Sequence, residues 1–491
     1  MAIRARLTAP KAAPTEWPWH HPKTGSISSS LIFSGDRRME AENFLASGYG
    51  VRAALEARRG AWLPLKDAAR IWQPSRLKGI QVDPQYGTPF LAATQVFDHR
   101  PVPRKWLSID RTDNVSDRFV KAGTILLTCS GTVGRAMVSS ESLSGFLVSH
   151  DLLRIDAADG GDGGWIYAWL RAPTVRQMML AAQYGHIIKH LEVSHLESLP
   201  LLSLKPELKE EFRTPVARIS ELRDQAHRLI DEGESLVTKA FPISGNGDDG
   251  STGFAIAATG MFGRGRRLDA NRHNPRAADA EAAVRKNAKK VEPLSDLVAR
   301  AFIPGRFKHV YGAEGSPYLD SAQILEVAPD IEKRVLSLAG EKQHGYIVDR
   351  GCLLIPCSGQ LHGIIGSVVL ATEWHENKVL TNHILRIIPK EKPNVRIGYL
   401  QAILGHPVLG RPRVQRGAFG SSVPELDVGD IRTLAIPRLA TKDEEKIADC
   451  YEQAAVLRGE ADQLEEQVST MAEEHLQNFL SGDTRHISPM Q

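Results

Sequence analysis

Two apolar segments of the chain follow the same pattern of hydrophobic and polar positions. The stretch KAGTILLTCSGTVGRAMVSS…FLVSHDLLRI (residues 121–155) returns as DRGCLLIPCSGQLHGIIGSVVL…VLTNHILRI (residues 349–387). Gly123 and Gly351 lie 228 residues apart, and Ile155 and Ile387 lie 232 apart. Each copy contains an apolar strand-like run, a turn at Ser-Gly and two further strand-like runs, which predicts a strand–loop–strand unit.

The repeat extends beyond this unit. Upstream, the sequence at 87–90 returns at 315–318, the sequence at 74–78 returns at 304–308, and the sequence at 38–41 returns at 267–270. A nearly constant offset over so long a stretch indicates tandem duplication. The fold class predicted for each copy is α/β (α+β), and a chain of 491 residues is long enough for each copy to bury its own core.

A helical period follows each module. Apolar residues recur every three or four positions in two seams, which predicts two long helices outside the globular cores, with Pro215 in or near the first turns of its helix. Pairing the seams in an antiparallel coiled coil would bury both. The first seam consists of Leu208, Phe212, Val216, Ile219, Leu222, Ala226, Leu229, Gly233 and Leu236, and the second of Ile447, Tyr451, Ala454, Leu457, Ala461, Leu464, Val468 and Met471. Shorter helices are predicted at about 40–59, 165–182 and 397–404.

These patterns predict a complete domain organisation. It comprises a flexible tail at 1–30, a first module at 31–205, a helix at 206–240, a linker at 241–262, a second module at 263–440, a helix at 441–480 and a tail at 481–491. No signal peptide or membrane-spanning run is evident, so we expect a cytoplasmic protein without a membrane partner.

Charge is distributed unevenly along the chain. Residues 441–480 contain three Lys/Arg and eleven Asp/Glu, whereas residues 264–290 contain nine basic and three acidic residues. This separation predicts a polyanion as partner of the modules and a protein as partner of the acidic segment.

No catalytic constellation occurs in the sequence. The phosphate-binding GxxxxGK[ST] and the metalloprotease HExxH are absent, and the only Asn-Pro, at Asn274, does not fit the motif of adenine-methylating enzymes. Cys352, Cys357 and His362 have a spacing that could suit a metal, but the first module keeps only Cys129. Buried, reduced thiols are therefore predicted, with no metal and no cofactor in this chain.

The remaining candidates are basic and polar residues on loops. Arg76 and Lys78 return as Arg306 and Lys308, and a basic pair kept in both copies suits contact with DNA phosphates. Loops that differ between the copies could read bases, since Arg and Gln carry donors that match base edges. These candidates are Ser130, Thr132, Arg135, Tyr184, His186 and Lys189 in the first module, and Gln360, His362, Arg413, Gln415 and Arg416 in the second. A solvated surface residue is the alternative at each position.

With these elements in order, the chain resembles the specificity (S) subunits of type I restriction-modification systems. The resemblance rests on the order module, helix, module, helix, on the strand-turn at 123–134, and on Arg267-Leu268-Asp269-Ala270 near the start of a module. The sequence departs from the family pattern at 199–207, where a proline-rich close is expected, and at 360–362.

The resemblance implies a function. Each module would be a target recognition domain that reads one half of a bipartite site in double-stranded DNA, and the helices would set the spacing of the halves. Two adenine methyltransferase subunits would supply S-adenosylmethionine and catalysis, and a restriction or translocase subunit would be a further partner in phage defence. Two alternatives remain: a scaffold or regulator derived from such a subunit, and a self-contained DNA-modifying enzyme.

Overall fold

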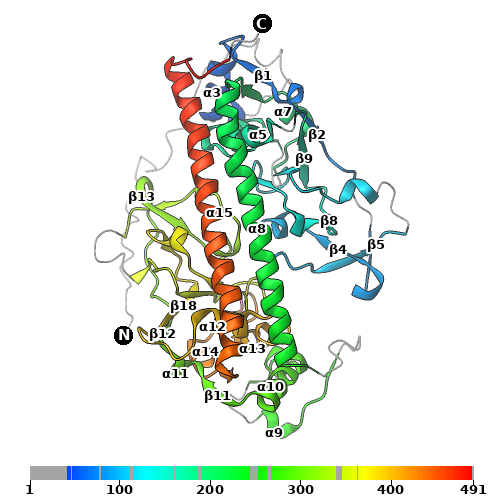
Figure 1. The fold of residues 1–491 in the computed structure, drawn as a ribbon, viewed down its shortest axis with the longest axis vertical. Helices are drawn as coiled ribbons and strands as arrows, with labels where there is room; N and C mark the ends of the chain where they lie inside the picture. The colour runs from blue at the N-terminus through cyan, green and yellow to red at the C-terminus, as the bar shows by residue number, and fades with distance from the viewer. Residues whose placement is uncertain are drawn as a thin grey trace, which may run out of the picture.

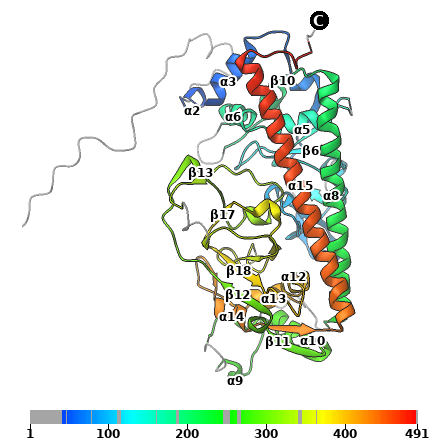
Figure 2. The same cartoon turned by 60° about the vertical axis from the view of Figure 1, so that its left-hand side comes forward.

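The computed structural model describes residues 41–45, 47–76, 79–110, 115–159, 161–184, 189–243, 253–261, 267–338, 345–361 and 363–488. The predicted tail at 1–30, the centre of the linker and the candidates Lys78, His186 and His362 lie outside these residues. Two mixed α/β modules occupy opposite ends of a pair of long helices (Figure 1). Seen from the side, the helix pair runs along one edge of the molecule (Figure 2).

The two long helices pack antiparallel. They are α8 (Pro206–Ala240) and α15 (Thr441–Ser481). At one end the ring of Phe212 lies 5.9 Å from that of His475, and at the other a Cβ on Gly233 would meet the Tyr451 ring at 2.6 Å. Pro206 occupies the first turn of α8, and Pro215 lies inside the helix, so the predicted place of Pro215 in the first turns is wrong.

The apolar seams of the helices belong to the cores of the modules. Phe212 and Ile219 of α8 and Val468 of α15 join the core of the first module. Ala226 of α8 and Tyr451 of α15 join the core of the second. The prediction of long helices outside the globular cores is therefore wrong, because each module covers the seams at its own end of the pair.

The first module contains a sheet against the helices and a sheet in an outer lobe. The inner sheet has the order β2-β9-β6-β7 and the outer sheet the order β3-β5-β4-β8, while β1 pairs with β10. The strands are β1 (Trp62–Pro64), β2 (Ala69–Trp72), β3 (Ile80–Val82), β4 (Thr88–Leu91), β5 (Lys105–Ser108), β6 (Ile125–Thr128), β7 (Ala136–Val138), β8 (Leu147–Val148), β9 (Leu152–Ala157) and β10 (Pro200–Leu202).

The second module repeats this topology. Its inner sheet has the order β12-β18-β15-β16, its lobe the order β14-β13-β17, and β11 pairs with β21. In both lobes two strands pair in parallel, Phe90 with Leu147 and Tyr318 with Val379. The strands are β11 (Lys290–Pro293), β12 (Val298–Phe302), β13 (Tyr311–Leu319), β14 (Arg334–Val335), β15 (Leu353–Pro356), β16 (Val369–Leu370), β17 (Val379–Leu380), β18 (Ile384–Pro389), β19 (Ala418–Phe419), β20 (Glu425–Leu426) and β21 (Ala435–Arg438).

Short helices complete both modules. The single helix predicted at 165–182 is two helices, because Pro173 has no N–H to continue the first. The helices are α2 (Ala41–Leu45), α3 (Ser47–Glu56), α4 (Ala93–Val96), α5 (Gly163–Arg171), α6 (Pro173–Ala182) and α7 (Val193–Glu197), then α9 (Ala258–Met261), α10 (Pro275–Asn287), α11 (Leu294–Leu297), α12 (Ile397–Gly405), α13 (Arg411–Gln415) and α14 (Val428–Arg432). None of the helices in the described ranges is long and apolar enough to cross a membrane.

The two modules touch at equivalent residues of the repeat. Asp98 and Glu326, which lie 228 positions apart, form an antiparallel bridge. The His99 amide donates to the Leu325 carbonyl at 2.7 Å, and the Val327 amide donates to the Phe97 carbonyl at 2.7 Å. Because the bridge pairs a residue with its own counterpart, it marks a local two-fold axis between the modules.

A buried charged network attaches both modules to the centre of the helix pair. Arg223 of α8 lies 3.6 Å from the Asp462 carboxylate and 3.0 Å from that of Glu465, both on α15. The Tyr167 hydroxyl of the first module donates to Glu465 at 2.5 Å, and the Ala328 amide of the second module donates to Asp462 at 3.2 Å. Burial is the main cause that raises the pKa of Asp462 to about 6.

Candidate nucleic-acid interface

The basic loops that follow β2 and β12 are built in the same way. The side chains of Arg76, Arg306 and Lys308 are exposed to solvent. In the first module Arg118 donates to the Ser75 carbonyl at 2.8 Å, and in the second Tyr346 donates to the Gly305 carbonyl at 3.0 Å. The two donors, Arg118 and Tyr346, are counterparts in the repeat, and so are the two acceptors, Ser75 and Gly305. The fold therefore holds both loops by their backbone and leaves the arginine side chains available to an anion.

Aromatic side chains surround the basic loop of the second module. The ring of Phe307 lies 4.6 Å from that of Tyr346, and the rings of His309 and Tyr311 stack 5.9 Å apart. Tyr311 is 46% exposed. We did not predict these residues from the sequence, although the alternation Phe307-Lys308-His309-Val310-Tyr311 carried the signal. Exposed rings beside basic side chains are suited to nucleic acid.

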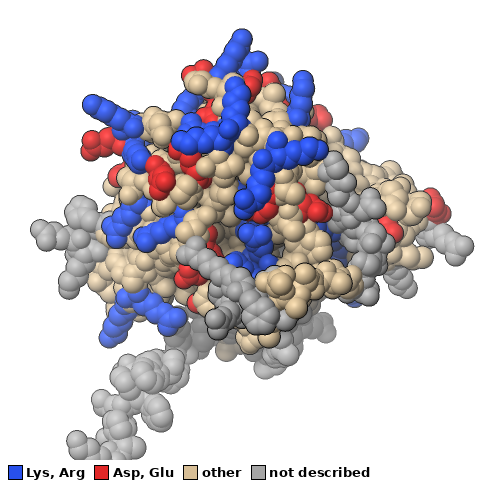
Figure 3. Space-filling model, turned by 90° about the horizontal axis from the view of Figure 1, so that it is seen from below, with Lys and Arg blue, Asp and Glu red and all other residues tan. Residues whose placement is uncertain are grey.

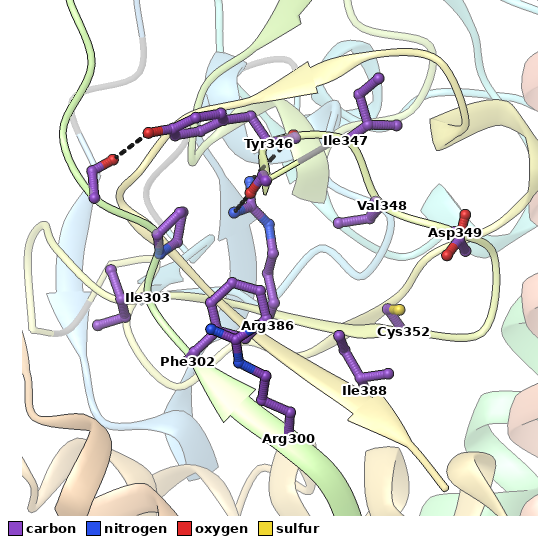
Figure 4. Close-up of a pocket in the computed structure, with 13 residues that line it drawn as sticks. Arg300, Phe302, Ile303, Tyr346, Ile347, Val348, Asp349, Cys352, Arg386 and Ile388 are labelled. Carbon is purple, nitrogen blue, oxygen red and sulfur yellow. Dashed lines mark hydrogen bonds between the residues drawn. The ribbon is translucent and has the colours of Figure 1, made fainter. Parts of the chain in front are cut away.

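A cavity of about 410 Å³ opens beside this loop (Figure 4). The Arg300 guanidinium lies 4.0 Å from the centre of the Phe302 ring. Arg386 donates to the carbonyls of Gly345 at 3.0 Å and Tyr346 at 3.2 Å, and burial lowers the pKa of Arg386 to about 10. Arg386 therefore supports the wall of the cavity, whereas Arg300 presents a charge with an aromatic face beneath it.

The first module has the same arrangement. Arg70 lies 5.5 Å from the centre of the Trp72 ring, and these two residues are the counterparts of Arg300 and Phe302. Arg154, the counterpart of Arg386, donates to the carbonyls of Ser149 and Val148, each at 3.0 Å. The duplication thus preserves this basic and aromatic corner in both copies.

The Ser-Gly tips that follow β6 and β15 rest on equivalent hairpins. The Gly131 amide donates to the Lys189 carbonyl at 3.0 Å, and its counterpart Gly359 donates to the Pro424 carbonyl at 3.1 Å. Ser130 bridges to His190, whereas Ser358 bridges to Glu425. Of the predicted base-reading residues, this geometry brings together Ser130, Thr132, Tyr184 and Lys189 in the first module.

The predicted base-reading residues at the two tips differ in their exposure to solvent. Thr132 and Gln360 are exposed, and Ser130, Tyr184 and Lys189 are half-buried. The Tyr184 ring lies 5.7 Å from that of His190. Phe419, which the repeat aligns with Tyr184, is 46% exposed on the hairpin of the second module and was not among the predicted residues.

Two of the predicted base-reading arginines are buried in internal contacts. Arg135 lies 2.9 Å from the Glu326 carboxylate and over the Phe97 ring, so it holds the modules together. Arg413 is 2% exposed and lies 3.0 Å from the Glu281 carboxylate. Burial lowers the pKa of Arg413. For Arg135 and Arg413 the structure corrects the sequence prediction, because their donors face protein groups.

The neighbouring candidates at the C-terminal end of α13, Gln415 and the C-cap residue Arg416, are partly engaged in contacts within the protein. Gln415 donates to the carbonyls of Leu361 at 2.7 Å and Ile365 at 3.0 Å. Arg416 is half-buried and lies 3.7 Å from the Glu281 carboxylate, and burial lowers its pKa. Of the predicted candidates in the second module that the structure describes, Gln360, Arg306 and Lys308 therefore have the most accessible side chains.

The basic segment of the second module forms one end of the molecule. Lys and Arg side chains crowd this face when it is viewed from below (Figure 3). Its exposed members include Arg276, Arg285, Lys286, Lys289 and Lys290, on and after α10. The first module has α3 at the opposite end of the molecule (Figure 1).

The acidic charge of α15 is largely compensated inside the chain. Carboxylates along this helix pair with basic side chains of both modules and of α8. The pairs are Glu444 with Arg438, Asp449 and Glu452 with Arg396, Glu460 with Arg218, Asp462 and Glu465 with Arg223, Glu465 also with Arg171 of the first module, and Glu466 with Lys378. The acidic composition of this segment therefore balances the arginines of its own chain.

The described residues contain no group of three or more His, Cys, Asp or Glu placed to hold a metal ion. Cys129, Cys352, Cys357 and Cys450 are buried and form no disulfide. Burial is the main cause that raises the pKa of Cys129 to about 12 and that of Cys357 to about 11. These thiols are core groups, as the sequence predicts.

No family model and no curated protein matches the sequence. The type I restriction-modification system S subunit from M. genitalium aligns at 12% identity and a TM-score of 0.34, over 87% of this chain and 98% of that chain. The HsdS subunit from Thermoanaerobacter tengcongensis aligns at 14% identity and a TM-score of 0.26, over 87% and 97%. A structure of complex assembly and conformational transition of the type I R-M system aligns at 13% identity and a TM-score of 0.26, over 85% and 98%.

Proposed function

We propose that this chain is the non-catalytic DNA-specificity subunit of a type I restriction-modification system, located in the cytoplasm. Each module would read one half of a bipartite site in double-stranded DNA. Methyltransferase subunits, in two copies, would supply S-adenosylmethionine and methyl transfer, and a restriction or translocase subunit would complete the assembly. The proposed target recognition domains are 31–205 and 263–440, joined by the helices at 206–240 and 441–480.

One observation carries this proposal: the two copies share the basic loops but differ in the contacts of their Ser-Gly tips. The basic loops are held by equivalent hydrogen bonds, from Arg118 to Ser75 and from Tyr346 to Gly305. The tips beside them differ, since Ser130 meets His190 and Ser358 meets Glu425. Equivalent basic loops are suited to the phosphates that every DNA sequence presents, and different tips are suited to two different half-sites.

The phosphate assignment can be tested on both modules at once. We expect Arg76→Ala and Arg306→Ala to weaken binding of the assembled complex by similar factors on cognate and unrelated DNA. Each should lower the slope of log affinity against log salt by roughly one unit. Fluorescence anisotropy over a salt series measures both quantities. Arg213→Ala, which removes an exposed arginine from α8, is the matched control.

Two outcomes would contradict the proposal. A loss confined to cognate DNA would mean that these arginines read bases and do not contact phosphates. If the complex bound all sequences equally, and methylome sequencing showed the same sites with and without this chain, the scaffold alternative would hold. Methyl transfer by the purified chain alone would favour the self-contained enzyme.

A further inference from the structure

A cavity of about 730 Å³ lies where the two modules meet the helix pair. The first module contributes Asp98 and Arg104, the second contributes Arg411, and α15 contributes Arg458. Apolar side chains that include Ile230 and Val368 line the rest. A volume of several hundred Å³ with a mixed lining is typical of small-molecule sites.

The local two-fold axis makes it possible to compare this cavity with its counterpart. On the opposite side of the axis, Arg176 lies 2.9 Å from Asp330 and 2.8 Å from Glu332. Arg223 lies 3.6 Å from Asp462 and 3.0 Å from Glu465. Arg171 also lies 3.5 Å from Asp330 and 3.6 Å from Glu465. Three arginines are thus neutralised by four carboxylates, and ion pairs occupy the space.

Arg223 and Arg176 have counterparts that are also arginines on the cavity side of the axis. Arg458 is the counterpart of Arg223, since the two helix seams match at an offset of 235 residues. Arg411 is the counterpart of Arg176, because the two lie against Gly366 and Gly134, which end the same turn in the two modules.

The four carboxylates of the ion-pair cluster align with residues that carry no carboxylate on the cavity side. Asp330 and Glu332 align with Val102 and Arg104 through the matching pairs Pro101/Pro329 and Lys105/Lys333. Asp462 and Glu465 align with His227 and Ile230. The cavity therefore keeps two of the three arginines of its counterpart and lacks all four of those carboxylates, although Asp98 and Glu234 also line it.

The electrostatics of the cavity agree with a missing anion. The Nη2 atom of Arg458 is buried without a hydrogen-bond acceptor among the described residues. The charges of Asp462 and Glu234 favour the charged form of Arg458, and they offset burial and the charge of Arg100 only in part. Burial, and next the charge of Arg100, lower the pKa of Arg458 to about 10. Burial and the charge of Arg104 lower the pKa of Arg411. A buried cation that is only partly compensated is costly, and an anion in the cavity would lower that cost.

We propose that this cavity binds a small organic anion. Its phosphate or carboxylate group would accept hydrogen bonds from Arg458 and Arg411, and its apolar part would pack on Ile230 and Val368. Such a ligand would touch both modules and α15, and would supply the charge that carboxylates supply on the other side of the axis. This site is separate from DNA recognition and does not depend on it.

The test uses the full-length chain and a series of probes that share one apolar tail. Hexyl phosphate and hexanoate differ in the anionic group, hexylammonium carries the opposite charge, and inorganic phosphate lacks the tail. We expect saturable binding of hexyl phosphate or hexanoate by isothermal titration calorimetry, with a rise in Tm, and at least about tenfold weaker binding of the other two probes. The first two probes decide between the phosphate and the carboxylate group.

Two variants locate the site. Arg458→Met should weaken binding by about tenfold or more, whereas Arg213→Met, on the exposed face of α8, should not change it. Arg104→Glu restores the carboxylate that Glu332 provides on the other side. It should abolish binding and raise the Tm without ligand, and Lys105→Glu is its matched control. Absence of saturable anion binding, or binding that persists in Arg104→Glu, would overturn the proposal.

Discussion

The contact between the modules should respond to pH through Asp98. Burial and the neighbouring Glu326 raise its pKa from 3.8 to about 7, against the opposing charges of Arg104, Arg135 and Arg411. Because the folded-state pKa is raised, the folded protein holds this proton more tightly than the unfolded chain. The stability from this group is fully present below about pH 4 and is lost as pH rises towards about 7.

The size of the effect follows from the shift. Each pKa unit corresponds to about 1.4 kcal/mol, so keeping Asp98 in the fold costs about 2 kcal/mol at pH 5 and at most about 4 kcal/mol at pH 8.5. Asparagine has the same shape and no charge to bury. We therefore expect Asp98→Asn to stabilise the protein, with a gain in unfolding free energy at pH 8.5 about twice that at pH 5.

Differential scanning calorimetry of the full chain at both pH values measures this gain as a difference in Tm. For domains of this size the Tm should rise by a few degrees per kcal/mol. Asp110→Asn, at an exposed position, is the control for removal of one negative charge. A gain that is equal at the two pH values, or larger at pH 5, would refute the reasoning, since the charge of Asp98 would then not be the source of the cost.

Three further predictions address the helices. Gly164→Ala should destabilise the protein by about 1–3 kcal/mol in calorimetry, because a Cβ there would lie 2.7 Å from the α8 backbone, whereas Gly163→Ala, whose nearest neighbour would be 3.7 Å away, should fold normally. Arg223→Met removes from the buried Asp462 and Glu465 the guanidinium that they share and should cost about 3–5 kcal/mol; an unchanged Tm would contradict the network. Inserting a matched heptad at the middle of α8 and of α15 adds about 10 Å to each, and under the proposed function should lengthen the gap between half-sites by about three base pairs in methylome sequencing. It should also break the Asp98–Glu326 bridge and lower the Tm, and an unchanged gap would mean that the helices do not set the spacing.

The duplication and the two long helices could be predicted because the sequence shows both directly: the first as a similarity between segments about 230 residues apart, the second as a local period of three or four residues. The matching positions include Gly123 and Gly351. The apolar positions from Phe212 to Leu236 recur every three or four residues. The helix from Pro206 to Ala240 follows from that spacing alone. The break before Pro173 was equally local, since a residue without an N–H ends a helical hydrogen-bond series, although we predicted a single helix there.

The candidate interface was predicted only in part, since exposure depends on contacts between residues far apart in the chain. Arg76 and Arg306 are exposed loop residues, as their polar surroundings suggest. Arg135 and Arg413 have the same chemistry, yet Glu326 and Glu281 engage them from elsewhere in the fold. No local pattern distinguishes a guanidinium that faces solvent from one that faces a carboxylate more than a hundred residues away.

The repeat and its periodicity establish that the chain contains two copies of one module, each followed by a long amphipathic helix. How the copies meet depends on the fold, because the bridge between Asp98 and Glu326 requires the helices to be antiparallel and both lobes to reach their centre. The fold also decided that the helix seams complete the module cores. The same arrangement places Arg458 and Arg411 around one cavity, although they belong to different elements and are neighbours only once the chain has folded.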